Sequence, residues 1–248
     1  MLGIKQKIRK TAVNFFKHFN ITAYVYYTFK YNDPFLIKKK LFGNEAITIF
    51  DVGAHDGRTA KLYRKYFPES KIYSFEPTPN TFRQLKNNIS SYQNVEVFNV
   101  ALSNFVGQTN FFINNSSMTN SLLKPLSDET YNSNDIYATK EKIKVDTDTI
   151  DNFCSVNKIE KINILKIDVQ GAERDVLNGT VDMLKKKNID LIYLEVEFIE
   201  LYLNQPLFHD ISLFLKTFDY NLYYLYNISV DKDGQMIYGD AIFLPNRN

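Results

Sequence analysis

The chain has 248 residues, of which 44% are hydrophobic, including 17 Tyr and 20 Phe, so it can form one large domain with a sizeable core. Thirty basic and 28 acidic side chains give a formal net charge of +2, which indicates no nucleic-acid partner. A single cysteine, Cys154, excludes an internal disulfide and a zinc cluster of several thiolates. We therefore expect a reducing, cytoplasmic location.

The N-terminal segment has the pattern of a basic amphipathic helix. It lacks the apolar core and the small-residue cleavage site of a secretion signal. Its apolar stripe consists of Ile4, Ile8, Ala12, Phe15 and Phe19. We expect residues 1–43 to form a helical extension of a domain over residues 44–248. The helix either packs on a domain surface or lies on an anionic membrane surface, such as the inner membrane face, and the residues leave both open.

Short apolar runs then alternate with amphipathic stretches. The predicted strands are Ile47–Val52, Lys71–Phe75, Val95–Val100, Asn163–Asp168, Asp190–Glu197, Asn221–Tyr226 and Ala241–Leu244. The predicted helices are Thr59–Tyr66, Pro79–Ile89, Thr149–Asn157, Ala172–Lys186 and Leu207–Phe218. This alternation predicts an α/β fold with a doubly wound, mostly parallel, seven-stranded sheet.

One long polar segment interrupts the alternation. Asn114–Lys142 is rich in Ser, Asn and Thr and has little periodicity. It lies between two strand-like pieces, Thr109–Ile113 and Ile143–Asp146, which we expect to pair as an added hairpin. Such an excursion from a compact sheet is either a surface loop or a lid over the ligand site.

The segment Asp51–Gly57, "DVGAHDG", is expected to end the first strand and to lead into a helix. Gly53 and Gly57 allow the backbone to approach a ligand closely. The third glycine of the dinucleotide fingerprint is missing, and the carboxylates of Asp51 and Asp56 would repel a pyrophosphate, which binds bare amides. A ligand with positive charge fits better. S-adenosylmethionine carries a sulfonium and an ammonium group and no phosphate.

The second predicted strand supports this interpretation. In "IYSFEPTP", Glu76 follows the strand directly, and Pro77 opens the connection to the next helix. A carboxylate at this point of a nucleotide-binding sheet accepts hydrogen bonds from the two ribose hydroxyls. We therefore predict that Glu76 binds the ribose of the cofactor.

Several segments in this order resemble the FkbM family of S-adenosylmethionine-dependent methyltransferases. They are "DVGAHDG", "FEPTPNTFRQLKNN", "NVALSNFVGQTNFF", "SLL", "VDTDTIDNF" and "ILKIDVQGAERDVLNG". The resemblance covers residues 47–197 and implies a Rossmann-like class I methyltransferase that methylates a sugar hydroxyl in glycan or secondary-metabolite biosynthesis. The expected cofactor-binding residues are Asp51, Gly53, His55, Gly57, Glu76, Pro77, Asn99, Ala101 and Asp168. Two positions depart from the family pattern: His55 replaces the usual Asn, and Gln170 replaces the usual Glu.

Methyl transfer to an alcohol needs a base or a metal ion, because the hydroxyl must lose its proton. Asp168 ends the fourth predicted strand and is the main candidate, acting directly or through a bound Mg²⁺ for which it would be the ligand. Glu195 and Glu197 share one face of the next strand and are expected to orient the acceptor. His55 is a further candidate base, although it could equally supply hydrogen bonds within the turn.

Two other functions remain open on the residues alone. One is a nucleotide-binding module of the same fold that serves in assembly without catalysis. The other is an NAD(P)-dependent oxidoreductase, which the missing glycine and the acidic turn disfavour. Binding of S-adenosylmethionine in preference to NAD would exclude the oxidoreductase, and product formation would exclude the module.

Overall fold

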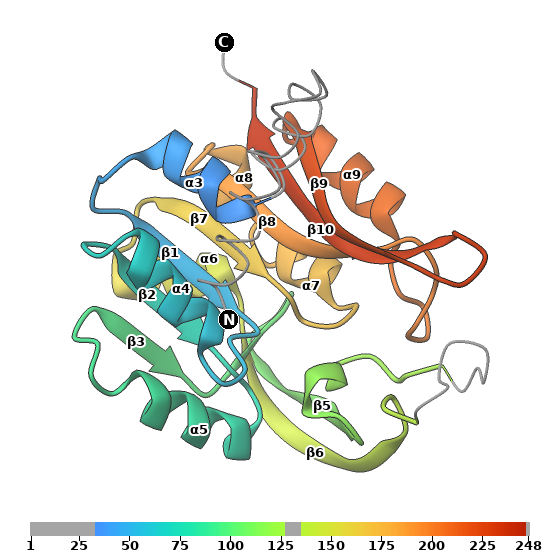
Figure 1. Cartoon of the computed structure of the whole chain (residues 1–248). Helices are drawn as coiled ribbons and strands as arrows, with labels where there is room; N and C mark the ends of the chain where they lie inside the picture. The colour runs from blue at the N-terminus through green and yellow to red at the C-terminus, as the bar shows by residue number, and fades with distance from the viewer. Residues whose placement is uncertain (1–32, 127–134, 247–248) are drawn as a thin grey trace, which may run out of the picture. The chain divides into compact units, whose positions relative to one another are not determined.

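The computed structural model describes residues 33–126 and 135–246 (Figure 1). The chain divides into two units, Met1–Asn44 and Glu45–Asn248. In the described part of the first unit, helix α3 (Pro34–Phe42) begins after Asp33, whose carboxylate accepts a hydrogen bond from the Phe35 amide. The predicted basic helix lies outside the described residues. Among the helices that are described, none has the length and apolarity needed to cross a membrane.

The second unit is built on a seven-stranded sheet with the order β3-β2-β1-β7-β8-β10-β9. Neighbouring strands from β3 to β8 are parallel, and β10 runs antiparallel to both β8 and β9. The strands are β1 (Thr48–Val52), β2 (Lys71–Phe75), β3 (Val95–Phe98), β7 (Ile162–Ile167), β8 (Ile189–Glu197), β9 (Tyr220–Val230) and β10 (Met236–Pro245). The predicted doubly wound, mostly parallel, seven-stranded sheet is confirmed.

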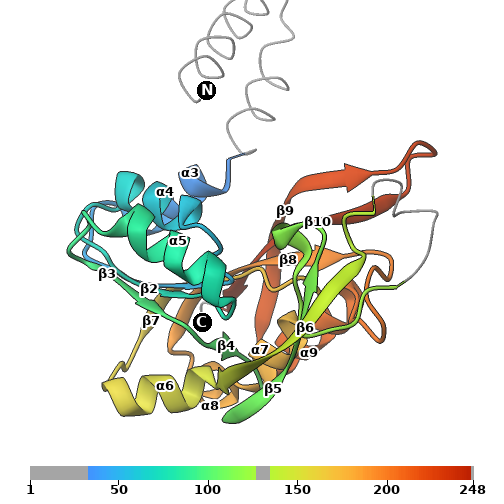
Figure 2. The same ribbon diagram turned by 90° about the horizontal axis from the view of Figure 1, so that it is seen from below.

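Helices cover both faces of this sheet. In Figure 2, α4 (Arg58–Tyr66) and α5 (Pro79–Ile89) lie on one side. On the other side are α6 (Ile150–Asn157), α7 (Glu173–Asn178), α8 (Val181–Lys185) and α9 (Phe208–Thr217). Because both faces are covered, β1 and β7 are buried along nearly their whole length, which explains their continuous apolar runs.

The prediction of one helix over Ala172–Lys186 was wrong, because the chain breaks into α7 and α8 at Gly179. The break brings Gly179 against the loop after β4, where a Cβ atom would lie 2.0 Å from the Ser103 carbonyl oxygen. A new helix N-terminus then needs acceptors for its free amides. Asp151 of α6 supplies them, since its carboxylate accepts from the amides of Asp182 (2.9 Å) and Met183 (3.0 Å).

A smaller three-stranded sheet has the order β4-β6-β5. Its strands are β4 (Ala101–Leu102), β5 (Gly107–Asn114) and β6 (Thr139–Asp148). The antiparallel pairing of β5 with β6 confirms the predicted hairpin. Several boundaries were wrong. The third strand ends at Phe98 rather than Val100, because Ala101 and Leu102 pair with β6. Strand β6 begins at Thr139, inside the predicted polar excursion, β9 ends at Val230 rather than Tyr226, and β10 begins at Met236 rather than Ala241.

An aromatic cluster packs directly below the strand ends that carry the candidate site. Phe75 of β2 and Phe153 of α6 meet edge to face, with ring centroids 4.9 Å apart. Phe50, Tyr73 and Phe98 surround this pair. The cluster holds β1, β2 and α6 together, so the loops that follow the strands start from fixed points.

Candidate active site

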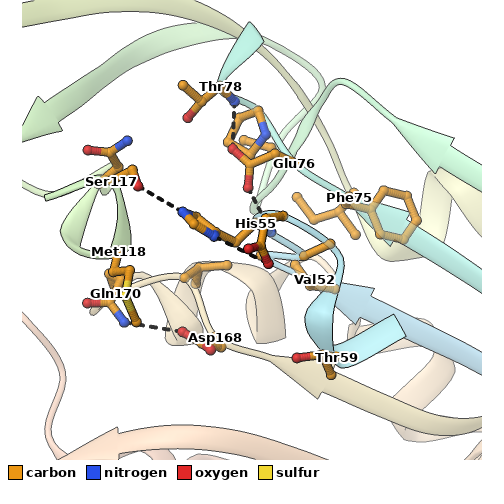
Figure 3. Close-up of a pocket in the computed structure, with 18 of the residues that line it drawn as sticks. Val52, His55, Thr59, Phe75, Glu76, Thr78, Ser117, Met118, Asp168 and Gln170 are labelled. Atoms are coloured by element: carbon orange, nitrogen blue, oxygen red, sulfur yellow. Dashed lines mark hydrogen bonds and ion pairs between the residues drawn. The ribbon is translucent and has the colours of Figure 1, made fainter. Parts of the chain in front are cut away.

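A cavity of about 240 Å³ opens at the carboxyl ends of the central strands, where ligands bind in open α/β sheets (Figure 3). Its walls include the turn after β1, the loop after β2, the start of the smaller sheet, the loop after β7 and Glu195 of β8. The segment that follows β5 closes one side with the residues Ser117, Met118, Asn120 and Leu122. Part of the predicted polar excursion therefore contributes to the site, while its closure as a lid stays a prediction.

The turn after β1 has three residues in the left-handed region. Gly53 (φ = 73°) is required by packing, because a Cβ there would lie 1.8 Å from the Asp168 carbonyl oxygen. Gly57 (φ = 85°) lies off the cavity wall, and a Cβ there would lie within 2.9 Å of Leu85 and Ile89 of α5. The glycine therefore serves helix packing, and the expectation that Gly57 lets the backbone approach the ligand stays a prediction.

His55, between these glycines, also has a left-handed backbone (φ = 47°), a conformation in which Asn, Asp and His are enriched among residues with a Cβ. Its Nε2 lies 2.9 Å from the Ser117 Oγ, across the cavity mouth, and its Nδ1 lies 3.8 Å from an Asp56 carboxylate oxygen. The imidazole thus contacts the segment after β5, as the close-up shows (Figure 3). The hydrogen bond of the His55 ring thus goes to Ser117 and not to another residue of the turn, and a role of His55 as a base stays a prediction.

Glu76 lies on the cavity wall with only 6% of its surface exposed. One carboxylate oxygen accepts from the Thr78 amide (2.9 Å) and the other from the His55 amide (3.1 Å), as Figure 3 shows. Burial raises the pKa of Glu76, although these hydrogen bonds oppose the shift. Each oxygen keeps a further lone pair, so the carboxylate can accept from two ligand hydroxyls.

Ala101 and Pro77 line the cavity as expected, but Asn99 does not. The Asn99 amide donates to the backbone oxygens of Glu76 and Pro77, each at 2.9 Å. It therefore fixes the loop after β2, and the expected direct contact of Asn99 with the cofactor is not supported.

Asp51 is fully buried and lies behind the cavity rather than on its wall. Its carboxylate pairs with the Lys166 Nζ at 3.2 Å, and the same ammonium donates to the backbone oxygens of Val52 and Gly53. Burial lowers the pKa of Lys166, but Asp168 and Asp51 outweigh it and the pKa is raised. Asp51 does not line the cavity and its charge is compensated by Lys166, so its contact with the cofactor stays a prediction.

Asp168 and Glu195 both reach the cavity and are joined through Gln170. The Gln170 Nε2 donates to Asp168 (3.2 Å) and to Glu195 (2.6 Å). Burial, together with Asp168, Glu197 and Glu173, raises the pKa of Glu195 well above its usual range. Glu197 is 3% exposed and does not line the cavity, so Glu195 is the member of the two expected acids that reaches it.

The surroundings of Asp168 do not fit the magnesium ion that the sequence suggested. One carboxylate oxygen accepts from Gln170, and the other lies 3.5 Å from the Lys166 ammonium, which would repel a cation. Among the described residues, the acids close enough to share an ion are Glu173, Glu195 and Glu197, with oxygens within 4.8 Å of one another. Asp168 is not part of that group.

The fold brings several residues to the site whose contacts there the sequence did not indicate. Lys166 compensates two acids, Gln170 bridges two others, and Ser117 contacts His55. The Tyr202 hydroxyl, 83 residues along the chain from Thr119, contacts both Thr119 O and Gln170 Oε1. No local pattern identifies these residues, because their partners are distant in the sequence.

The donor set fits S-adenosylmethionine. Glu76 can accept from a ribose diol, and Phe75, Val100, Ala101 and Leu102 form an apolar wall suited to an adenine ring. Asp168 supplies a carboxylate, 44% exposed, for the positively charged methionine end. The cavity wall thus combines the three kinds of surface that this cofactor requires.

The chain matches known proteins over most of its length. The model of the methyltransferase FkbM domain matches residues 51–222. The 2-O-methyltransferase NoeI of Sinorhizobium fredii is 30% identical over 167 residues, 63% of this chain and 66% of that protein. The methyltransferase sdnD of Sordaria araneosa is 28% identical over 53% of this chain and 59% of its own length, so the chain spans somewhat less than two thirds of these relatives.

Among solved structures, Aeropyrum pernix fibrillarin with bound S-adenosyl-L-methionine aligns with a TM-score of 0.46 and 13% identity over 84% of this chain and 74% of that one. A precorrin-6y C5,15-methyltransferase from Geobacter metallireducens aligns with a TM-score of 0.46 and 8% identity over 86% of this chain and 87% of that one.

Proposed function

Because the chain belongs to the FkbM methyltransferase family, we propose that it transfers a methyl group from S-adenosylmethionine to a sugar hydroxyl. The observation that carries the proposal is the position of Glu76 at the end of β2, with both oxygens oriented by backbone amides and facing a cavity with an apolar wall. The acceptor is a sugar unit of a glycan or of a secondary metabolite. The name of the Sinorhizobium fredii relative, a 2-O-methyltransferase, supports a secondary hydroxyl as the target.

Bound S-adenosylmethionine supplies an electrophilic methyl group on its sulfonium sulfur. Glu76 holds the ribose, the apolar wall holds the adenine, and Asp168 faces the methionine end. The segment after β5 lines one side of the cavity, where shielding from water favours displacement by a weakly nucleophilic alcohol.

The proton of the acceptor hydroxyl goes to the carboxylate pair Asp168 and Glu195. An unperturbed carboxylate is a weak base for an alcohol, and a base with a pKa closer to neutrality is more effective. Burial and the neighbouring acids raise the pKa of Glu195, so its ionised carboxylate is a stronger base than an unperturbed one. Lys166 orients Asp168, and Gln170 holds the two acids side by side.

Calorimetry with S-adenosylmethionine, S-adenosylhomocysteine and NAD tests the cofactor, and we expect binding of the first two only. Methyl transfer from labelled cofactor to a panel of methyl glycosides tests the acceptor, with the 2-deoxy glycosides as matched controls. Product with a glycoside and none with its 2-deoxy form would support a 2-hydroxyl target. Cofactor binding without product on sugars or on hydroxylated secondary metabolites would favour the non-catalytic module.

A further inference from the structure

Gln170 connects the acid pair of the cavity to the segment that follows β5. Its Nε2 donates to Asp168 Oδ1 at 3.2 Å and to Glu195 Oε2 at 2.6 Å. Its Oε1 lies 3.2 Å from the Tyr202 hydroxyl, and its backbone oxygen accepts from the Ser121 Oγ at 2.7 Å. Every polar group of the side chain therefore has a partner, and the partners come from three different parts of the chain.

The backbone of Gln170 is also unusual, because its φ of 58° lies in the left-handed region. A glutamine there is strained and persists only where the surroundings hold it. Glycine adopts the conformation with little strain, so it would be the simplest residue if the turn alone mattered. The contacts of the side chain are the feature that a glycine would not provide.

An amide has a property that neither an acid nor a base offers at this position. Two carboxylates this close repel each other unless a proton, a cation or a hydrogen-bond donor lies between them. A neutral NH₂ group has two hydrogens and can donate one to each carboxylate without adding charge. The Tyr202 hydroxyl on the Oε1 side orients the amide so that its nitrogen faces the acids. The other ionisable groups that interact electrostatically with the acid pair are Lys166, Glu173, Glu197, Tyr137, Tyr193, Tyr202 and Asp240.

On the basis of the proposed function, we propose that Gln170 is the positioning residue of the proton-accepting pair. Its amide keeps Asp168 and Glu195 side by side on the cavity wall in place of a shared proton or a metal ion. Gln170 acts by positioning these acids and by holding the segment after β5. No contact between Gln170 and the transferred methyl group is required.

A first experiment needs no acceptor and compares melting temperatures of the parent and Gln170→Glu between pH 5 and pH 8. The new carboxyl lies between two acids, so its folded-state pKa rises above its unfolded value. The contribution of this carboxyl to folding stability is then complete at low pH. It is lost as the pH rises from the unfolded-state pKa to the folded-state pKa of the group. We expect the melting temperature of the variant, relative to the parent, to fall by about 3–6 °C across this range.

Gln108→Glu is the matched control, because Gln108 also donates to a carboxylate, Asp146 at 2.7 Å, but at an exposed position of the smaller sheet. We expect the difference in melting temperature between Gln108→Glu and the parent to stay nearly constant with pH. If the difference in melting temperature between Gln170→Glu and the parent is also constant with pH, the amide does not bridge ionisable acids. That result would overturn the proposal.

A second experiment uses the methyl acceptor from the glycoside panel and separates the side chain from the backbone. Gln170→Gly relieves the left-handed backbone but removes the amide, so we expect kcat to fall about 10- to 100-fold, as for lost hydrogen bonds to charged groups. The Kd for S-adenosylhomocysteine should change less than about threefold, a difference well below one tenfold step in affinity. The pH profile of Gln170→Glu should shift to lower pH, where the new acid is protonated.

A Gln170→Gly variant with the kcat of the parent would assign Gln170 a backbone role only and would overturn the inference. Failure of the parent to bind S-adenosylhomocysteine would instead overturn the proposed function. The melting experiment would still report on Gln170 in that case, so the two failures are distinguishable.

Discussion

Lys166 and Asp51 form an ion pair beneath the turn of the candidate active site, with 3.2 Å between Nζ and Oδ1 and side-chain exposures of 5% and 0%. The ammonium also donates to the backbone oxygens at which β1 ends and the turn begins. One buried charge thus links two strand ends, β1 and β7, at the point where the cofactor cavity opens. The pair belongs to the framework of the site and not to its wall.

This arrangement predicts a large stability loss for Lys166→Met. Removing one partner leaves a buried, uncompensated carboxylate, which costs about 3–5 kcal/mol of unfolding free energy. The double variant with Asp51→Asn should recover much of that loss, since neither charge then remains. Urea denaturation measures the unfolding free energies of the parent, Lys166→Met and the double variant. Lys161→Met, which breaks an exposed pair with Asp190 at 3.0 Å, should cost less than about 1 kcal/mol, and an equal cost at both lysines would contradict the framework role.

Glu76→Ala should weaken binding of S-adenosylhomocysteine by about 1.5–3 kcal/mol, because two hydrogen bonds to a charged group are lost. Calorimetry measures the change. Glu96→Ala on β3 removes an exposed carboxylate paired with Lys71 at 3.0 Å and should leave affinity unchanged. Parent-like affinity of the Glu76 variant would remove this residue from the cofactor site.

Asp168→Asn and Glu195→Gln should each keep the fold and lower turnover by roughly 100-fold, the usual worth of an acid–base group. Both substitutions preserve shape and remove a proton acceptor. Turnover on the glycoside acceptor is the measurement, with the affinity for S-adenosylhomocysteine as a check that the cavity is intact. If either variant turns over at the parent rate, that carboxylate does not take the proton.

Glu173 predicts a pH dependence of stability. Burial raises its pKa to about 7, although backbone amides, including that of Val169 at 2.8 Å, oppose the shift. Because the folded state holds this proton more tightly than the unfolded state, stability falls as pH rises from about 4.5 to about 7.

Glu173→Gln removes the titration, so its unfolding free energy relative to the parent should increase with pH, by at most about 3 kcal/mol for a shift of this size. Urea unfolding at pH 5 and pH 8 measures the trend. Glu160→Gln, at an exposed position, serves as the control. A pH-independent difference for Glu173→Gln would show that this acid is ionised throughout the range.

Much of the fold could be predicted from the sequence because hydrophobic periodicity is a local property. Each buried parallel strand needs an apolar run, and each covering helix needs an apolar stripe, so β1, β2 and β7 were located within one or two residues. Glu76 was predicted as a site residue for the same reason, since a polar residue after a buried strand must reach the carboxyl edge of the sheet.

The sequence also determined which chemical groups are available, but only the tertiary structure decided which of them face the ligand. Three residues in the motifs of the site contribute to the framework of the fold. Asp51 pairs with Lys166, Gly57 packs against α5, and Asn99 holds the loop after β2. The break between α7 and α8 likewise depends on Ser103 and Asp151 from other elements. The physical reason is that the direction of a side chain and the compensation of a buried charge depend on neighbours that are distant along the chain and come together only on folding.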